Sequence, residues 1–258
     1  HLMFISIVIA ATVLLCIFFR NCDDKTFRRI VLIGWLTILT LEIYKQIIFS
    51  FNYDGTNVTW DYQWYAFPFQ LCSTPLYVLP FVVFLKDGKL RDAMMIYIQT
   101  FSFFGGLAVF IYPNDVFVET VGINFQTMIH HGLQVVFGIY FVAYNRKRLD
   151  KKSILGALPV FGALVSLALV MNILMDYIFK AKGIDETFNM FYIGPAHAST
   201  LPILSSIYPN VPYVVFLLIY VLGFCAISTG IFYAGYGITR LVSSLSGSYG
   251  KRSNKKTA

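Results

Sequence analysis

The chain has 258 residues, of which 57% are hydrophobic and only 13% charged, and its mean hydropathy is +0.68. Soluble domains carry about a quarter charged residues, so this composition excludes an ordinary soluble globule and indicates extensive contact with lipid. The formal net charge of +7 is spread over short connectors and the C-terminal end, which argues against nucleic-acid binding and for basic loops beside a membrane.

Apolar runs long enough to cross a bilayer recur along the chain. A spanning helix needs about 20 mostly apolar residues. Scanning at that length predicts helices at Leu2–Phe19, Ile30–Phe51, Pro68–Leu85, Ala93–Tyr112, Phe125–Tyr144, Ile154–Phe179 and Val211–Thr239. The first run has no basic segment before it and no small-residue cleavage site after it, so we expect a retained helix and not a signal peptide. The predicted fold is all-α: a polytopic bundle of seven transmembrane helices over residues 1–245, then a basic disordered tail at 246–258.

The positions of lysine and arginine predict the orientation of the bundle. Of the 20 basic residues, 17 lie after the first, third and fifth predicted helices or after the last, whereas the connectors after the second and fourth contain none. Basic loops stay on the cytoplasmic side during insertion. We therefore expect a multi-pass plasma-membrane protein with its N-terminus outside and its C-terminus inside. The connector 52–67, rich in tyrosine and tryptophan, should lie in the outer headgroup region.

Polar side chains within the apolar runs are functional candidates, because unpaired ionisable groups are costly inside a bilayer. Glu42 and Lys45 lie three residues apart on one helical face, where they can either neutralise each other or line a polar cavity. Cys72 opens the third helix beside Gln70, hydroxyl residues and prolines, about one turn below the outer surface. It is either a small apolar filler, the common role of such cysteines, or a nucleophile.

Two adjacent histidines lie at a similar depth in the fifth helix. His130 follows the start of that helix by roughly 9 Å, close to the level of Cys72, and histidine is the usual base for a thiol. Adjacent helical residues point about 100° apart, so only one of His130 and His131 should face Cys72; a hydrogen-bonded core role is the alternative. The same geometry disfavours a shared metal ion, and we expect no metal or other cofactor. Asp176 and Asn189 belong to the same outer half.

Three short segments carry a family resemblance: Leu71-Cys72-Ser73, the His130-His131 region and Asn189-Met190-Phe191-Tyr192. The sequence resembles the bacterial YwaF-like integral membrane proteins, which are similar to the animal transmembrane protein 164 acyltransferases. The resemblance spans most of the chain and implies a cysteine and histidine pair that moves a fatty acyl chain between membrane phospholipids through an acyl-enzyme. Carried over, the pair is Cys72 and His130. One departure is Gln70, where the family pattern leads us to expect a histidine, and this weakens any role assigned to Gln70.

Two classes of function follow from the polar layer. The first is a membrane lipid acyltransferase or acyl hydrolase that acts on phospholipids near the outer leaflet, with Cys72 and His130 as the catalytic pair. Its supporting residues are His131, Gln70, Glu42, Lys45, Asp176 and Asn189. The second is a transporter or binding protein whose polar residues line a path for a small solute or ion. A conduit needs polar residues through its full depth. The inner halves of the predicted helices hold few polar residues, such as Gln99 and Thr37, and this favours a site on one side of the membrane. Gly105-Gly106 indicates close helix packing, and a scaffold locked by its polar layer is a third possibility.

Overall fold

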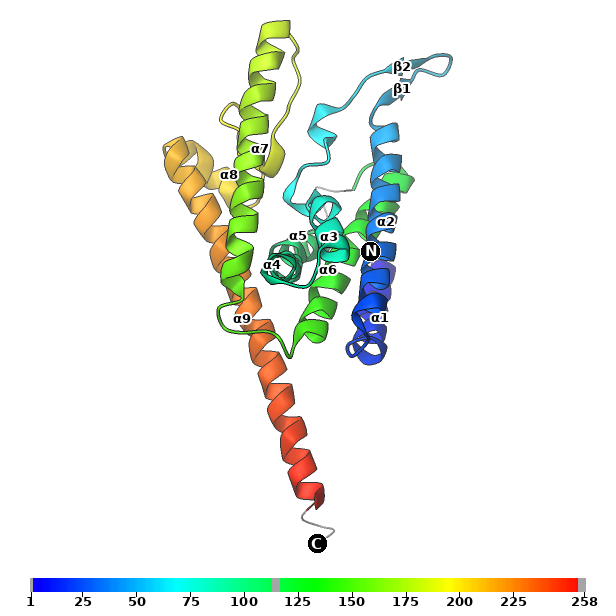
Figure 1. Cartoon of the computed structure of the whole chain (residues 1–258). Helices are drawn as coiled ribbons and strands as arrows, with labels where there is room; N and C mark the ends of the chain where they lie inside the picture. Colours follow the sequence, from blue (N-terminus) through cyan, green and yellow to red (C-terminus); the bar gives the residue numbers. More distant parts are fainter. Residues whose placement is uncertain (1, 113–116, 255–258) are drawn as a thin grey trace.

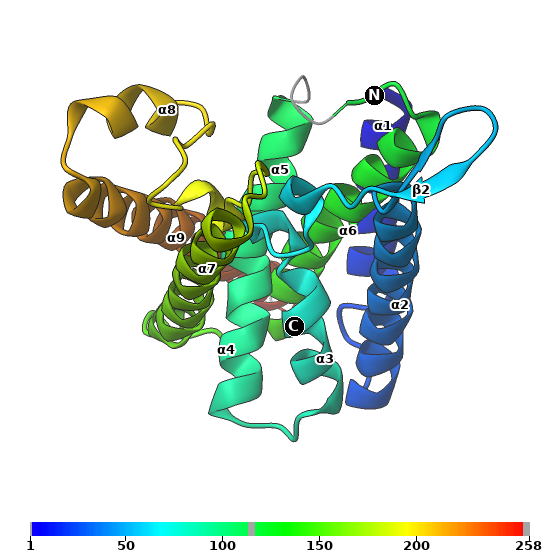
Figure 2. The same ribbon diagram turned by 90° about the horizontal axis from the view of Figure 1, so that it is seen from above.

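A computed structural model describes the backbone of residues 2–112 and 117–254 and the side chains as far as residue 245. The helices in these ranges are α1 (Leu2–Phe18), α2 (Asp24–Ile48), α3 (Pro75–Phe84), α4 (Lys89–Tyr97), α5 (Phe103–Ile111), α6 (Val121–Asn145), α7 (Ile154–Lys182), α8 (Leu204–Ile207) and α9 (Tyr213–Asn254). Figures 1 and 2 show α1, α2 and α6 on one side, α7, α8 and α9 on the other, and α3, α4 and α5 between them. The fold is therefore helical, as the composition predicts.

Four segments are long and apolar enough to cross a membrane: Asp24–Ile48, Lys89–Ile111, Ile154–Lys182 and Tyr213–Leu245. Of the other predicted runs, the first and third form the shorter apolar helices Leu2–Phe18 and Leu71–Phe84, and the fifth lies within α6. A helical membrane protein is thus confirmed, whereas the count of seven spans and the orientation of the termini stay predictions. The predicted tail at 246–258 also stays a prediction, since its side chains lie outside the described part of the chain.

Two helix starts differ from the predicted ones for local reasons. α2 begins at Asp24 and not at Ile30, because the Asp23 carboxylate caps the helix by accepting a hydrogen bond from Thr26 N at 2.6 Å. The third helix, predicted from Pro68 to within two to four residues, begins at Leu71. The chain first forms the short 3₁₀ helix η2 (Leu71–Ser73), and Pro75 then opens α3, a position where proline's missing N–H does no harm. Cys72 therefore lies in a 3₁₀ turn just before the regular α-helix.

The interior is filled by aromatic and aliphatic side chains between closely packed helices. α1 and α5 both pack on α6, α4 packs on α7, and α2 packs on α3. Contact between α5 and α6 is very close at Gly106, where an added Cβ would lie 2.7 Å from Gln134 Cβ and 2.8 Å from the carbonyl oxygen of His131. The glycine pair at 105–106 is thus a helix-packing element, as its sequence predicts.

One helical segment contains a π-helical turn. η3 (Ile98–Ser102) joins α4 to α5 within the span Lys89–Ile111, and it packs against both α6 and η2. Its side chains are buried, including the polar ones of Gln99, Thr100 and Ser102. π-Helical turns are rare and often occur at functional sites.

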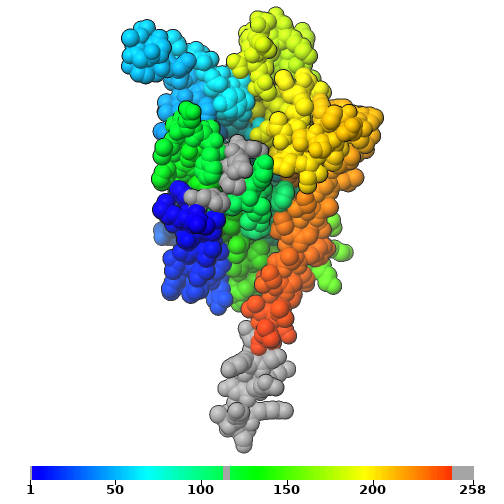
Figure 3. All heavy atoms as spheres, turned by 180° about the vertical axis from the view of Figure 1, so that it is seen from behind, coloured from blue at the N-terminus to red at the C-terminus, as the bar shows by residue number. Residues whose placement is uncertain are grey.

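The basic connectors meet at one end of the molecule. The guanidinium of Arg91 is fully buried and pairs with Asp24 at 2.7 Å and with Asp87, while Arg148 pairs with Asp87 at 3.2 Å. These pairs join α2, the connector between α3 and α4, and the connector after α6. The strands β1 and β2 and the segment between α7 and α9 lie at the opposite end (Figures 1 and 3). The grouping of the basic connectors therefore agrees with the sidedness seen in the sequence.

A small β-hairpin follows α2, where the sequence suggested only an aromatic surface connector. β1 (Phe51–Tyr53) and β2 (Val58–Trp60) pair antiparallel, and their side chains are exposed. The turn is closed by the Asp54 carboxylate, which accepts hydrogen bonds from Asn57 N at 2.7 Å and from Thr56 N at 2.9 Å. Gly55 adopts φ +97° within this turn. The bond from Asn57 N, followed by the second backbone bond, lowers the pKa of Asp54 to about 2.

Candidate functional site

Cys72 is tied to α6 through its backbone. Its carbonyl oxygen accepts a hydrogen bond from His130 Nε2 at 2.9 Å and another from Gln134 Nε2 at 2.7 Å. The two donors lie one turn apart on α6, so a single helix face holds the cysteine. Of the two histidines, His130 is therefore the one that contacts Cys72, and the contact is made to the carbonyl oxygen.

The hydrogen bonds fix which nitrogen of each neutral imidazole carries the proton. A carbonyl oxygen only accepts, so His130 Nε2 is protonated and Nδ1 keeps its lone pair. His131 Nδ1 likewise donates to the carbonyl of Thr127 at 2.7 Å, which leaves the lone pair on Nε2. Both lone-pair nitrogens are buried and make no hydrogen bond in the described part of the chain. The site thus holds two buried bases whose ring centres are 5.5 Å apart.

Further buried polar atoms in this region also have no partner among the described residues. They are Glu42 Oε2, Gln134 Oε1, both amide atoms of Gln99 and Ser102 Oγ. A buried polar group without a partner costs about 1–3 kcal/mol. In native proteins such groups are normally served by water or a ligand. Because η3 packs on η2 and α6, these atoms can form hydrogen bonds with a polar group bound near Cys72.

Glu42 and Lys45 form the ion pair that their spacing allows. Their charged atoms are 2.8 Å apart, and both side chains are mostly buried. Gln46 extends the contact: its amide donates to Glu42 at 2.8 Å and accepts from the Tyr62 hydroxyl at 2.7 Å. The pair therefore neutralises two charges on an apolar helix, and Gln46 connects α2 with the connector 52–67.

Gln70, two residues before Cys72, is bound to the segment that begins at Asn189. Gln70 Nε2 donates to the carbonyl of Asn189 at 3.0 Å, and its Oε1 accepts from Phe191 N at 2.7 Å. The side chain of Asn189 accepts from Gly194 N at 2.7 Å and donates to the carbonyl of Ala198 at 3.2 Å. Each amide thus uses its oxygen and one N–H to hold the segment 189–198, which indicates a positioning role for both side chains.

The segment held by Gln70 is strained. Phe191 and Tyr192, in the 3₁₀ helix η4 (Met190–Tyr192), both adopt φ 57°. Such left-handed conformations persist in side chains of this size only where the surroundings fix them. Asn172 of α7 supplies a second restraint, because its side chain accepts from Met190 N at 2.7 Å and donates to Met190 O at 2.9 Å.

The structure gives Asp176 a partner on its own helix and adds two amide residues to the candidate site. Asp176 pairs with Lys180 on its own helix at 2.8 Å and makes no hydrogen bond to either imidazole in the described ranges. Gln134 and Asn172 were not selected as site residues, although both are amides on apolar helices, a signal that could have marked them. No three histidine, cysteine, aspartate or glutamate side chains are arranged to hold a metal ion in residues 2–112 and 117–245.

The fold and the site together define a helical membrane protein in which His130 and Gln134 of α6 bind the backbone carbonyl of Cys72. The model of the TMEM164 family matches residues 1–234, and the chain belongs to that family. This confirms the relation to transmembrane protein 164 that the short motifs indicate. Searches of curated proteins and of solved structures gave no match.

Proposed function

We propose that this protein is a membrane-embedded lipid acyltransferase or lipid acyl hydrolase, with Cys72 as nucleophile and His130 as general base. One observation supports this above the others. His130 is held against the Cys72 residue by a 2.9 Å hydrogen bond, and that bond leaves the lone pair of its second nitrogen free. The resemblance of the cysteine and histidine motifs to acyltransferases supplies the chemistry.

In the first step, the Cys72 thiol gives its proton to the His130 imidazole, and Sγ attacks the carbonyl carbon of a phospholipid acyl ester. The S–C bond forms, the ester C–O bond breaks, and the lysolipid oxygen takes the proton from the imidazolium. In the second step, the hydroxyl of a lysolipid, or water, gives its proton to His130 and attacks the thioester. A new ester or a free fatty acid leaves, and Cys72 Sγ recovers the proton.

The short third helix supports access for such a substrate. η2 and α3 together cover Leu71–Phe84, 14 residues that span about 21 Å, less than the hydrocarbon thickness of about 30 Å. Irregular backbone at membrane depth is tolerated only where it is buried in protein or lines a polar cavity. The buried, unpartnered atoms His131 Nε2 and Gln134 Oε1 would then receive hydrogen bonds from a polar headgroup or from water.

A transporter or binding protein is the second candidate. It is favoured by buried polar atoms on other helices that have no partner among the described residues, namely those of Gln99 on η3 and of Ser228 and Tyr220 on α9. A pathway formed by these groups needs no covalent step. Its function would therefore survive replacement of the Cys72 thiol, whereas acyl transfer would not.

The decisive experiment is to trap the acyl-enzyme. The full chain is reconstituted with a phospholipid whose acyl chain carries an alkyne, and protein-bound acyl groups are detected, tested with neutral hydroxylamine and mapped by mass spectrometry. We expect a hydroxylamine-sensitive thioester at Cys72 that is absent in Cys72→Ala. In His130→Gln its rate of formation should fall by about 10²–10⁴, the usual contribution of a general base.

Matched controls distinguish catalysis from damage to the fold. His131→Gln changes the neighbouring residue in the same way, but the base that we assign is retained, so labelling should fall less than tenfold. Cys225→Ala removes a thiol from α9 and should leave labelling unchanged. Full labelling in His130→Gln, or acyl transfer that persists in Cys72→Ala, would refute the assignment.

A further inference from the structure

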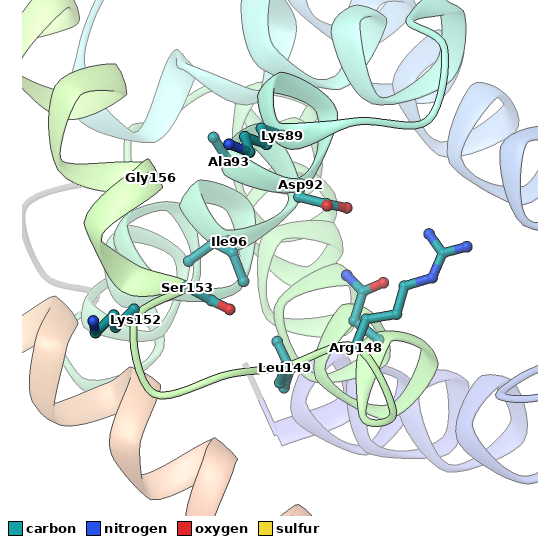
Figure 4. A pocket seen from close by; sticks show the side chains of 10 residues that line it. Lys89, Asp92, Ala93, Ile96, Arg148, Leu149, Lys152, Ser153 and Gly156 are labelled. Atoms are coloured by element: carbon teal, nitrogen blue, oxygen red, sulfur yellow. The ribbon is translucent and has the colours of Figure 1, made fainter.

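A second candidate site lies at the basic end of the molecule, at the opposite end from the hairpin. A cavity of about 280 Å³ opens between the first turns of α4, the end of α6 and the start of α7 (Figure 4). Ligand pockets commonly measure about 300–1,000 Å³, so this cavity suits a headgroup or a similarly small polar group. The chemistry proposed for Cys72 does not use it.

The charge around the cavity favours an anion. Lys89, Arg148 and Lys152 line it together with a single carboxylate, Asp92. In the close-up view Asp92 and Arg148 lie on one side of the cavity and Lys152 on the other (Figure 4). Arg148 also pairs with Asp87 at 3.2 Å, whereas neither lysine forms an ion pair within the described residues. Two ammonium groups are thus available for a phosphate.

The deepest polar group lining the cavity requires a hydrogen-bond donor. Asn145 is 3% exposed, and its amide nitrogen donates to the sulfur of Met95 at 3.4 Å. Its Oδ1 is buried and has no partner in the described part of the chain. An amide oxygen does not bind a fully ionised phosphate, but it accepts well from a hydroxyl group. A ligand with both a phosphate and free hydroxyls would satisfy the lysines, Asn145 and Asp92 together.

The setting of the cavity identifies the source of such a ligand. Apolar residues, among them Ile96 and Leu149, complete its wall, and the exposed side chains of Leu90 and Leu155 lie on the adjoining turns of α4 and α7. A lipid headgroup in this cavity would allow its acyl chains to lie along those leucines. A soluble phosphate compound would leave them uncovered.

We propose that the cavity binds the headgroup of an anionic phospholipid that carries free hydroxyl groups, of the phosphatidylglycerol type. The phosphate lies between Lys89, Lys152 and Arg148, and the hydroxyls donate to Asn145 Oδ1 and to the Asp92 carboxylate. This binding site is independent of the acyl-transfer reaction. It places a specific lipid where three helices meet, and bound lipid stabilises the folded chain by RT ln(1 + [L]/Kd), which rises with lipid concentration.

Binding is measured on the purified full chain in detergent, by thermal shift and native mass spectrometry, with short-chain phosphatidylglycerol, phosphatidic acid, phosphatidylcholine and free glycerol 1-phosphate. We expect phosphatidylglycerol to bind at least tenfold more tightly than each of the others. Equal binding of phosphatidylcholine would overturn the anion site, and equal binding of glycerol 1-phosphate would overturn the lipid assignment. Equal binding of phosphatidic acid would overturn the role of the hydroxyls.

Variants locate the site. The double variant Lys89→Ala/Lys152→Ala should weaken phosphatidylglycerol binding at least tenfold. Its control, Lys86→Ala/Lys151→Ala, removes the same charge from exposed positions outside the cavity and should change binding less than twofold. Equal losses in the two double variants would show nonspecific attraction and overturn the site. Asp92→Ala, which removes the side-chain acceptor, should reduce the preference for phosphatidylglycerol over phosphatidic acid, and an unchanged preference contradicts the hydroxyl contact.

Discussion

The substitution Gly106→Ala tests the closest helix contact beside the candidate site. The added Cβ would meet Gln134 Cβ at 2.7 Å and the His131 carbonyl oxygen at 2.8 Å, and the second of these atoms is backbone, which cannot rotate away. α5 and α6 must therefore separate. Overpacking costs about 1–3 kcal/mol, and the better helix propensity of alanine returns about 1 kcal/mol. We expect a net loss of up to about 2 kcal/mol.

The neighbouring glycine provides a matched control. A Cβ at Gly105 would make only ordinary contacts, 3.6 Å from Gln134 Oε1 and 3.8 Å from Cys72 Cα. Gly105→Ala gains the same helix propensity without the clash, so the difference between the two variants isolates the overpacking term. At about 2–4 °C per kcal/mol, 1–3 kcal/mol corresponds to a difference in Tm of about 2–12 °C.

The assay is thermal unfolding of the two purified variants side by side in one detergent, followed by tryptophan fluorescence. Gly106→Ala should have the lower Tm. It should also label more slowly with the acyl probe, because Gln134 holds the carbonyl of Cys72. Equal Tm values, or a less stable Gly105→Ala, would refute the inferred packing of α5 on α6.

Three other predictions concern stability and pH. Arg91→Met should lower Tm by several degrees more than Arg29→Met, because Arg91 is a buried partner of two carboxylates. Both carboxylates are partly hydrated, so the loss of unfolding free energy should lie near the lower end of about 3–5 kcal/mol. Asn172→Ala removes two hydrogen bonds to the strained segment and should lower Tm and release that segment, measured as faster amide exchange. The lowered pKa of Asp54 stabilises the hairpin above about pH 4, and this contribution should disappear as pH falls through about 2. Trp60 fluorescence should change over that pH range, and the change should be absent in Asp54→Asn.

The helices and their grouping follow from patterns within short stretches of sequence, so they could be predicted. Apolar runs mark the helices, basic connectors mark one end, and the spacing of Glu42 and Lys45 allows the ion pair that forms. Each of these signals depends only on residues close together in the chain.

The details of the site depend on contacts between distant residues, which single-sequence patterns do not reveal. The bond from Gln70 to Asn189 joins residues 119 positions apart, and that from His130 to Cys72 joins residues 58 apart. Periodicity alone left His130 and His131 equivalent, and packing distinguishes them. The hairpin was missed because its strands are only three residues long and exposed, too short for an alternating pattern.

The π-helical turn at Ile98–Ser102 determines the direction in which α5 presents its side chains. A turn of this kind holds one more residue than an α-helical turn, so the residues after it are rotated by about 100° from the positions that a continuous helix would give them. Deleting one residue within the turn would restore a regular helix and move the glycine face of α5 away from α6. The close approach of Gly106 to Gln134 and His131 therefore depends on one inserted residue within the segment Lys89–Ile111.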